Sequence, residues 1–271
     1  RKLRLRLKAF LKKKLNSLKK CYLQIRHIAG KKLVNGLKEL LFIVQAAFNG
    51  KIIHITPSWV SYKEQIDILN KQDGLIEIQT DVRNNFHIDH IELDNVLSEI
   101  GNQPKMILFN NPNNPTGVCY DNDELLALSL IFKKHNCFVF SDEIYVIVCF
   151  QPGMKSISEY IPELTIRGSS VSKDLGCGGY RLGWVAFPET LGNIFEKCKN
   201  FSSRIYSCPC VPMQYATNDM LQNTELYKTH YTNLSELFDF ISNRLTPLLN
   251  PTKLQVSVPN AAWYIFVDFS N

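Results

Sequence analysis

The sequence predicts an α/β fold, in which helices cover both faces of a mostly parallel β-sheet. Two observations lead to this prediction: helical and strand patterns alternate from residue 36 to residue 187, and short apolar runs end in turn motifs. The chain has 271 residues, of which 45% are hydrophobic, so it can bury a large core. No stretch approaches the ~18 apolar residues of a membrane span, and we expect a soluble protein.

The expected elements follow from hydrophobic periodicity and from the residues at turns. Apolar residues at helical spacing, with Asp121 or Asn122 as one of the caps, predict helices over residues 36–47, 59–70, 92–100 and 122–135. Short apolar runs between turn signals predict strands over 51–56, 74–79, 105–110, 137–140 and 165–167, and a closing strand at 184–187. Beyond residue 189 we expect helices over 191–201, 211–221 and 226–249, then short strands at 254–258 and 263–267.

The net charge of +6 is unevenly distributed along the chain. Residues 1–38 carry 14 Lys and Arg and no acidic residue, whereas the remainder carries 17 basic and 25 acidic residues. Apolar residues at helical spacing in this basic arm, among them Leu7, Leu11 and Leu18, predict an amphipathic helix that packs on the body. Binding to nucleic acid or anionic lipid, and organellar import, are the alternatives for the arm.

Eight cysteines are scattered along the chain, and no two of them form a Cys-x-x-Cys pair. In a chain of this length the pattern predicts reduced, mostly buried thiols in a cytoplasmic protein, and not a disulfide framework. Cys208 and Cys210 are close in sequence, but no histidine cluster lies near them, so we expect no metal site.

Polar motifs follow three of the expected strands. They are Asn-Asn-Pro-Asn-Asn-Pro-Thr-Gly at 110–117, Ser-Asp-Glu-Ile-Tyr at 141–145, and Ser-Val-Ser-Lys at 170–173, which Arg181 follows. Gly36 opens a helix whose free N–H groups attract an anion. Because ligands bind at the carboxyl ends of parallel strands, we expect these motifs to meet in one pocket. A lysine there could act as a nucleophile beside a phosphate grip; a surface loop with a solvated lysine is the alternative.

Four segments resemble, in chain order, the signatures of fold-type I aminotransferases, which use pyridoxal 5′-phosphate (PLP). They are Asn-Pro-Thr-Gly at 114–117, residues 141–145, residues 170–173 and Gly-Tyr-Arg-Leu-Gly at 179–183. Residues 57–62 resemble the Trp-containing turn of class I/II, the branch similar to aspartate aminotransferase. The resemblance covers residues 30–268 and implies a PLP-binding large domain with a partial α+β small domain.

The resemblance implies a role for each matching residue. Lys173 would form a Schiff base with PLP and then move a proton, and Asp142 would keep the pyridine nitrogen protonated. Tyr145 and Asn114 would hydrogen-bond the phenolate oxygen of the cofactor. Trp59 would stack on the cofactor ring.

The resemblance also implies a phosphate site. The side chains of Ser170 and Arg181 would bind the phosphate, together with a backbone cradle formed by Gly36, Leu37 and Lys38. Relatives usually carry a small residue where Leu37 stands. This departure makes the cradle the weakest part of the match.

Other departures concern the ends of the chain. The family binds the substrate carboxylate with an arginine of the small domain, and this chain ends at Asn271, just after a segment (260–266) that resembles the one ahead of that arginine. Relatives also carry a longer section before Gly36. We therefore expect a chain truncated at both ends: a basic helical segment at 1–30, the PLP-binding large domain at 31–223 and the start of an incomplete small domain at 224–271.

The predicted function is PLP-dependent transamination between an L-amino acid and a 2-oxo acid. Another PLP enzyme on the same scaffold (a β-lyase or a synthase) is an alternative, because the cofactor motifs are common to these enzymes. A truncated, non-catalytic remnant is the other alternative, because of the expected truncation. The resemblance implies a homodimer, with residues 203–212 near its interface. We expect no membrane span and no nucleic-acid partner.

Overall fold

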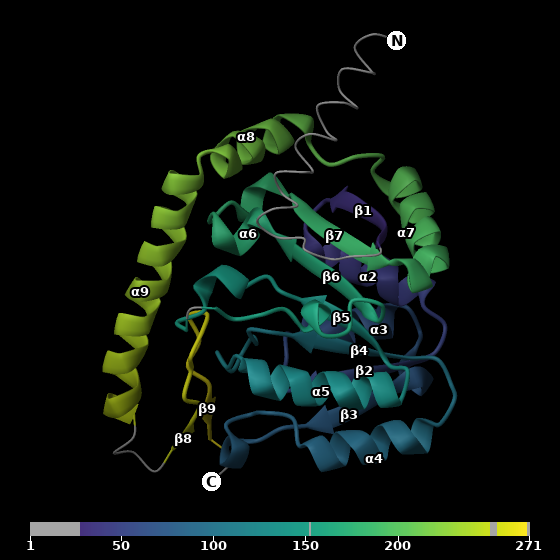
Figure 1. Cartoon of the computed structure of the whole chain (residues 1–271), viewed down its shortest axis with the longest axis horizontal. Helices are drawn as coiled ribbons and strands as arrows, with labels where there is room; N and C mark the ends of the chain where they lie inside the picture. Colours follow the sequence, from purple (N-terminus) through teal and green to yellow (C-terminus); the bar gives the residue numbers. More distant parts are fainter. Residues whose placement is uncertain (1–27, 152, 250–253, 270–271) are drawn as a thin grey trace.

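The computed structural model describes residues 28–151, 153–249 and 254–269, and the basic arm up to residue 27 lies outside them. A seven-stranded sheet forms the centre of the molecule, in the order β1-β7-β6-β5-β4-β2-β3 (Figure 1). Its strands are β1 (Ile28–Val34), β2 (Lys51–Thr56), β3 (Leu75–Gln79), β4 (Lys105–Asn110), β5 (Phe138–Asp142), β6 (Thr165–Ser170) and β7 (Gly183–Pro188).

The strand directions confirm the mostly parallel sheet. β3, β2, β4, β5 and β6 pair in parallel, β7 is antiparallel to β6, and β1 is antiparallel to β7. β1 was not among the predicted strands. Its residues fall in the basic arm and lack a continuous apolar run. It is held at the edge of the sheet by its pairing with β7, where Lys32 lies opposite Val185 and Val34 opposite Gly183.

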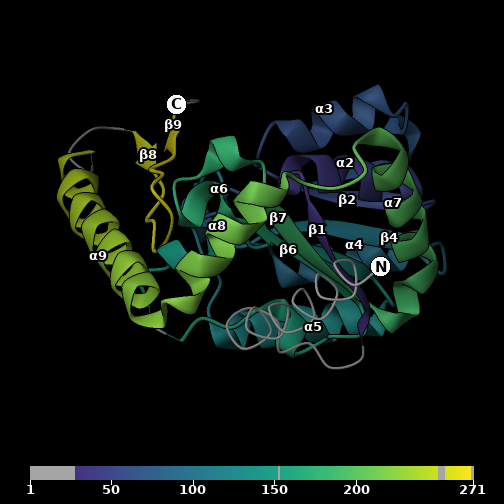
Figure 2. The same cartoon turned by 90° about the horizontal axis from the view of Figure 1, so that it is seen from above.

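Helices cover both faces of the sheet, as Figure 2 shows from above. The bounds of the five that do so are α2 (Leu37–Ala47), α3 (Ser61–Ile68), α4 (His90–Ile100), α5 (Asn122–Lys134) and α7 (Gly192–Ile205). Successive residues of the fully buried β4 alternate between the two cores: Met106 and Leu108 pack with α2, α3 and α7, and Ile107 and Phe109 with α4 and α5. A strand buried on both faces is therefore continuously apolar.

Acidic side chains cap the starts of two helices. Asp121 and Glu124 form a capping box at the start of α5, and Asp89 caps α4, which begins at His90, two residues before the expected start. Every described helix is too short or too polar to span a membrane. The same residues contain no group of three or more His, Cys, Asp or Glu side chains that could hold a metal ion.

The C-terminal part lies beside the large sheet. α8 (Val211–Gln222) and α9 (Thr224–Leu249) run along one side of the molecule, followed by the two-stranded antiparallel sheet of β8 (Gln255–Val256) and β9 (Val267–Asp268) (Figure 1). The strand expected at 263–267 begins only at Val267, and a turn with a left-handed Ala262 (φ 58°) lies ahead of it. The domain boundary at residue 223 stays a prediction.

Candidate active site

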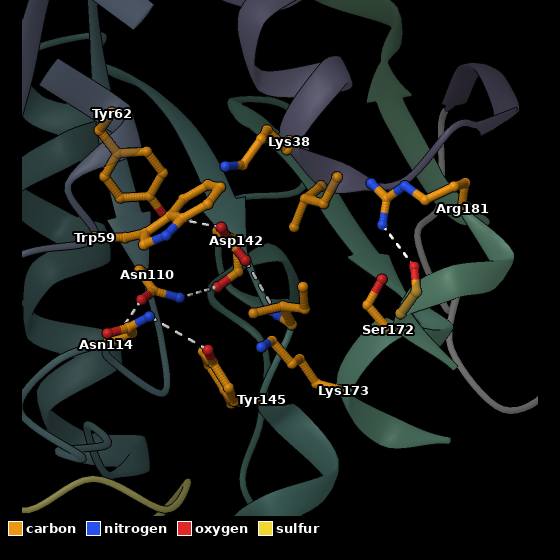
Figure 3. Close-up of a pocket in the computed structure, with 13 residues that line it drawn as sticks. Lys38, Trp59, Tyr62, Asn110, Asn114, Asp142, Tyr145, Ser172, Lys173 and Arg181 are labelled. Carbon is orange, nitrogen blue, oxygen red and sulfur yellow. Dashed lines mark hydrogen bonds between the residues drawn. The ribbon is translucent and has the colours of Figure 1, made fainter. Parts of the chain in front are cut away.

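A cavity of about 250 Å³ opens where β4, β5 and β6 end and α2 begins (Figure 3). Its wall contains three cationic side chains, one carboxylate and three aromatic rings. The lining residues are Leu37, Lys38, Trp59, Tyr62, Asn110, Asn114, Asp142, Ile144, Tyr145, Ser172, Lys173, Gly178 and Arg181. Residues at the ends of several strands therefore line one cavity, as expected from the sequence.

Asp142, the last residue of β5, presents a buried carboxyl to this cavity. The Tyr62 hydroxyl donates to Oδ2 over 2.8 Å, and the Ile144 N–H donates to Oδ1 over 3.1 Å. Burial raises the pKa of Asp142 to about 6, and these two hydrogen bonds oppose that rise. The carboxyl is thus largely ionised at neutral pH, in a place where only a proton donor or a cation can complete its hydrogen bonding.

Lys173 lies on α6 (Val171–Asp174), a single helical turn directly after β6. Its Nζ atom is 5.9 Å from the ring centroid of Tyr145 and 5.6 Å from that of Trp263. Aromatic faces favour a cation but accept no proton from it. The amine therefore lies at the cavity wall beside two aromatic rings, where a ligand in the cavity can reach it.

Arg181 and the start of α2 form the basic side of the cavity. The Arg181 guanidinium donates to the carbonyls of Gly178 (2.8 Å) and Asn35 (3.2 Å), which fixes its direction. Gly36 has a φ of 83°, and a Cβ there would collide with that guanidinium. The Lys38 amine lies 4.7 Å from the centroid of the Trp59 ring. This arrangement suits a phosphate group, because it combines two cations with a helix N-terminus.

Ser170 and Gly36 lie next to the cavity and are not among its lining residues. Ser170 is fully buried, and its hydroxyl accepts from the Ser172 N–H (3.1 Å) as the N-cap of α6. Ser172 is the serine that lines the cavity. The other eight predicted residues, from Leu37 to Arg181, all line it.

Asn114 and Tyr145 meet on the opposite side. The Asn114 side-chain amide donates to the Tyr145 hydroxyl over 3.3 Å, and the Asn114 N–H donates to Oδ1 of Asn110 over 2.8 Å. Burial raises the pKa of Tyr145. Tyr145 thus keeps its proton and can donate it to a ligand.

Sequence reasoning assigned no role to Tyr62, Asn110 and Ser172. Tyr62 belongs to the Trp-containing turn, three residues after Trp59, and its ring packs edge-on against Trp59 with centroids 5.5 Å apart. Asn110 ends β4 as Asp142 ends β5, and its amide donates to the Asp142 carbonyl over 3.0 Å. For Asn110, its position as a polar residue at the end of a buried strand was the signal that could have identified it.

The family model and the similar proteins all indicate an aminotransferase family. The family model described as aminotransferase class I and II matches residues 6–271. An aspartate aminotransferase of Sulfolobus acidocaldarius is 26% identical over 230 residues, which are 84% of this chain and 55% of that protein. An aspartate aminotransferase of Bacillus subtilis is 29% identical, over 83% of this chain and 56% of that protein. The chain thus spans little more than half the length of these relatives.

Solved structures share the fold. The aspartate aminotransferase of Thermus thermophilus with maleate has a TM-score of 0.78 and 26% identity, over 89% of this chain and 62% of that one. The aromatic aminotransferase of Pyrococcus horikoshii has a TM-score of 0.76 and 25% identity, over 88% of this chain and 62% of that one.

Proposed function

Because this chain belongs to the class I and II aminotransferases, we propose that it moves an amino group between an L-amino acid and a 2-oxo acid with PLP as its cofactor. One observation carries the proposal: Lys173, Asp142 and Arg181 line the same cavity. The relatives named aspartate, aspartate/prephenate and aromatic aminotransferases support transamination over a β-lyase or a synthase. The choice among these amino donors is left to experiment.

The residues of the cavity fit PLP by their chemistry. A buried carboxylate suits a protonated pyridine nitrogen, an indole suits an aromatic ring, and a cationic helix start suits a phosphate. Gly36 supports the last point, since any side chain there would fill the space beside the Arg181 guanidinium. When bound, PLP supplies an electron sink for the carbanion that forms at the α-carbon of the amino acid.

Each side chain has a task that follows from its surroundings. Lys173 would act as a nucleophile through Nζ and later hold the proton removed from the substrate. Asp142, ionised at neutral pH and held by Tyr62, would keep a proton on the pyridine nitrogen. Asn114 and Tyr145 would donate to the phenolate oxygen, and Trp59 would cover one ring face. We keep these roles as proposals.

The phosphate would be bound by Arg181, Lys38 and the N–H groups at the start of α2. The Arg181 guanidinium, already oriented by two carbonyls, can present a two-pronged set of donors. The Leu37 side chain lines the cavity, so that residue would contribute its N–H group to the cradle while its side chain narrows the space. Ser170 would act indirectly, as the cap that orients α6.

We also propose a homodimer, in line with the family resemblance. Phe201, Ile205, Val211 and Tyr215 expose 39–57% of their surface around the segment expected near the interface. These side chains belong to two consecutive helices, and exposed apolar side chains are frequent at subunit contacts. Sedimentation of the purified protein tests this, and a monomer at all concentrations would contradict it.

The function is tested by trapping the cofactor. The purified protein is mixed with PLP, reduced with borohydride and digested, and we expect the pyridoxyl group on Lys173 alone. Lys173→Ala removes the label, whereas Lys155→Ala, a change outside the cavity, retains it. A label spread over surface lysines, or no label, would refute the proposal. Single half-reactions with aspartate, alanine and aromatic amino acids then identify the amino donor.

A further inference from the structure

Residues 259–264 form a loop that lies next to the candidate site, in contact with Tyr145 and Lys173. The Asn260 and Ala261 N–H groups donate to the Gly117 carbonyl (3.1 and 3.0 Å), and the Ala262 N–H donates to the Val148 carbonyl (2.6 Å). These bonds attach the loop to the segments that follow β4 and β5. Gly117 permits this approach, because a Cβ there would lie 2.5 Å from the Tyr264 carbonyl oxygen. The loop is therefore held by the same strand ends that carry Asn114 and Tyr145.

The loop places two aromatic rings against Tyr145. The Tyr264 hydroxyl lies 2.6 Å from the Tyr145 hydroxyl, and the two rings pack edge-on with centroids 5.5 Å apart. The Trp263 ring packs edge-on against Tyr145, with centroids 5.2 Å apart, and lies tilted by 44° against Phe238 of α9, with centroids 5.3 Å apart. The position of Tyr145 is thus fixed by groups more than a hundred residues away in the sequence.

The hydrogen bonds around the Tyr145 oxygen limit where its proton can go, and either of the two tyrosine hydroxyls can be the donor in the bond between them. A phenol has one proton to donate and two positions that accept. The Asn114 amide nitrogen donates to this oxygen and fills one position. If Tyr264 donates as well, both positions are filled and the Tyr145 proton is free for a ligand in the cavity. If Tyr145 instead donated to Tyr264, it would have no proton left for that ligand.

We propose that Tyr264 is a positioning residue, whose hydroxyl donates to the Tyr145 oxygen and leaves the Tyr145 proton for the phenolate oxygen of PLP. This inference rests on the proposed function, because it concerns the same cofactor. Tyr145 is 2% exposed, and its burial raises its pKa, so it remains a protonated phenol throughout the working range. Tyr264 would act on the reaction only through Tyr145.

The test measures the acidity of the bond between Lys173 and PLP. A donor to the phenolate oxygen weakens its attraction for the protonated nitrogen and so lowers the pKa of that nitrogen. Tyr145→Phe removes the donor, and we expect a rise of about 1–2 pH units. Tyr264→Phe leaves the Tyr145 donor in place but removes the group that orients it, and we expect the pKa of the nitrogen to rise by about 0.5–1 unit. Both are read from the absorbance of the PLP-loaded protein as a function of pH.

The double variant Tyr145→Phe/Tyr264→Phe is the decisive measurement. If Tyr264 acts through Tyr145, the double variant has the same pKa as Tyr145→Phe alone. Additive shifts, or an unchanged pKa in Tyr264→Phe, would overturn the inference. Tyr160→Phe is the matched control, since its hydroxyl donates to the Asn122 carbonyl (3.0 Å) outside the cavity, and we expect no shift.

The proposed function fails in a different way. A wild-type protein that retains no PLP absorbance after the unbound cofactor is removed would refute cofactor binding itself, and the role of Tyr264 with it. A wild-type protein that titrates normally, next to a Tyr264→Phe variant that titrates identically, would refute only the role of Tyr264. Thermal unfolding of each variant without PLP separates a loss of fold from a loss of orientation.

Discussion

The buried carboxyl of Asp142 should lower the stability of the fold at neutral pH while it supports the proposed activity. The variant Asp142→Asn tests both effects, because stability and activity should change in opposite directions. The carboxyl is 3% exposed, and burial raises its pKa from 3.8 to about 6. A carboxyl with a higher pKa in the folded than in the unfolded chain stabilises the fold fully below the unfolded pKa. That contribution is lost as the pH rises through the folded pKa.

The magnitude follows from the size of the shift. A pKa difference of about two units corresponds to about 3 kcal/mol, at 1.36 kcal/mol per unit. The wild-type protein without PLP should lose up to this much unfolding free energy between about pH 4 and pH 7 because of Asp142. An asparagine has no such titration and can still accept a hydrogen bond from Tyr62. The variant should therefore match the wild type near pH 4 and exceed it by up to about 3 kcal/mol at pH 7.

The assay is urea unfolding of both proteins without PLP at several pH values. Asp67→Asn, on the exposed side of α3, is the control, and we expect it to follow the wild type at every pH. A variant that is less stable than the wild type at pH 7, or a difference that does not change with pH, would refute the burial argument.

The activity should change in the opposite direction. The variant loses a charge-assisted hydrogen bond to the pyridine nitrogen, worth about 1.5–3 kcal/mol, which corresponds to a roughly 10- to 150-fold slower half-reaction. The covalent attachment of PLP to Lys173 should persist. Half-reaction rates close to those of the wild type would contradict the role proposed for Asp142.

Three further changes test other contacts. Gly36→Ala should weaken PLP binding about tenfold or more in a fluorescence titration, because its Cβ collides with the Arg181 guanidinium; unchanged affinity would contradict the phosphate site. Tyr62→Phe removes a bond that lowers the pKa of Asp142, so the acid limb of the pH–rate profile should move up by about 0.5–1 unit; a shift downward would oppose the geometry. Lys71→Met removes an amine that donates to three carbonyls near the end of α2 and should cost about 1–2 kcal/mol in urea unfolding; an unchanged midpoint would show these bonds to be without net effect.

Local patterns were sufficient to predict most of the elements and most of the cavity wall. Asp142 and Asn114 follow buried strands, and parallel pairing brings such ends to one edge of the sheet. The prediction named Ser170 and not Ser172, because the sequence does not show where α6 starts. The Ser170 hydroxyl caps that helix, and Ser172, two residues later, lines the cavity.

Contacts between distant parts of the chain were beyond sequence reasoning. Tyr62 reaches Asp142 across 80 positions, and Tyr264 reaches Tyr145 across 119. Neither separation leaves a periodicity or a spacing to detect. β1 escaped prediction for a related reason, since an edge strand is defined by its partner, β7, and not by an apolar run of its own.

A chain of hydrogen bonds connects the two proposed ends of the cofactor ring. Tyr62 donates to the Asp142 carboxyl, and Asn110 donates to the Asp142 backbone carbonyl. Asn110 in turn accepts from the Asn114 N–H, and Asn114 donates to Tyr145. The group proposed for the pyridine nitrogen and the group proposed for the phenolate oxygen are therefore fixed relative to each other through Asn110. A displacement of Asp142 would therefore be transmitted to Asn114 and Tyr145 through these bonds. For this reason the buried amide of Asn110 belongs to the site as much as the residues that would touch PLP.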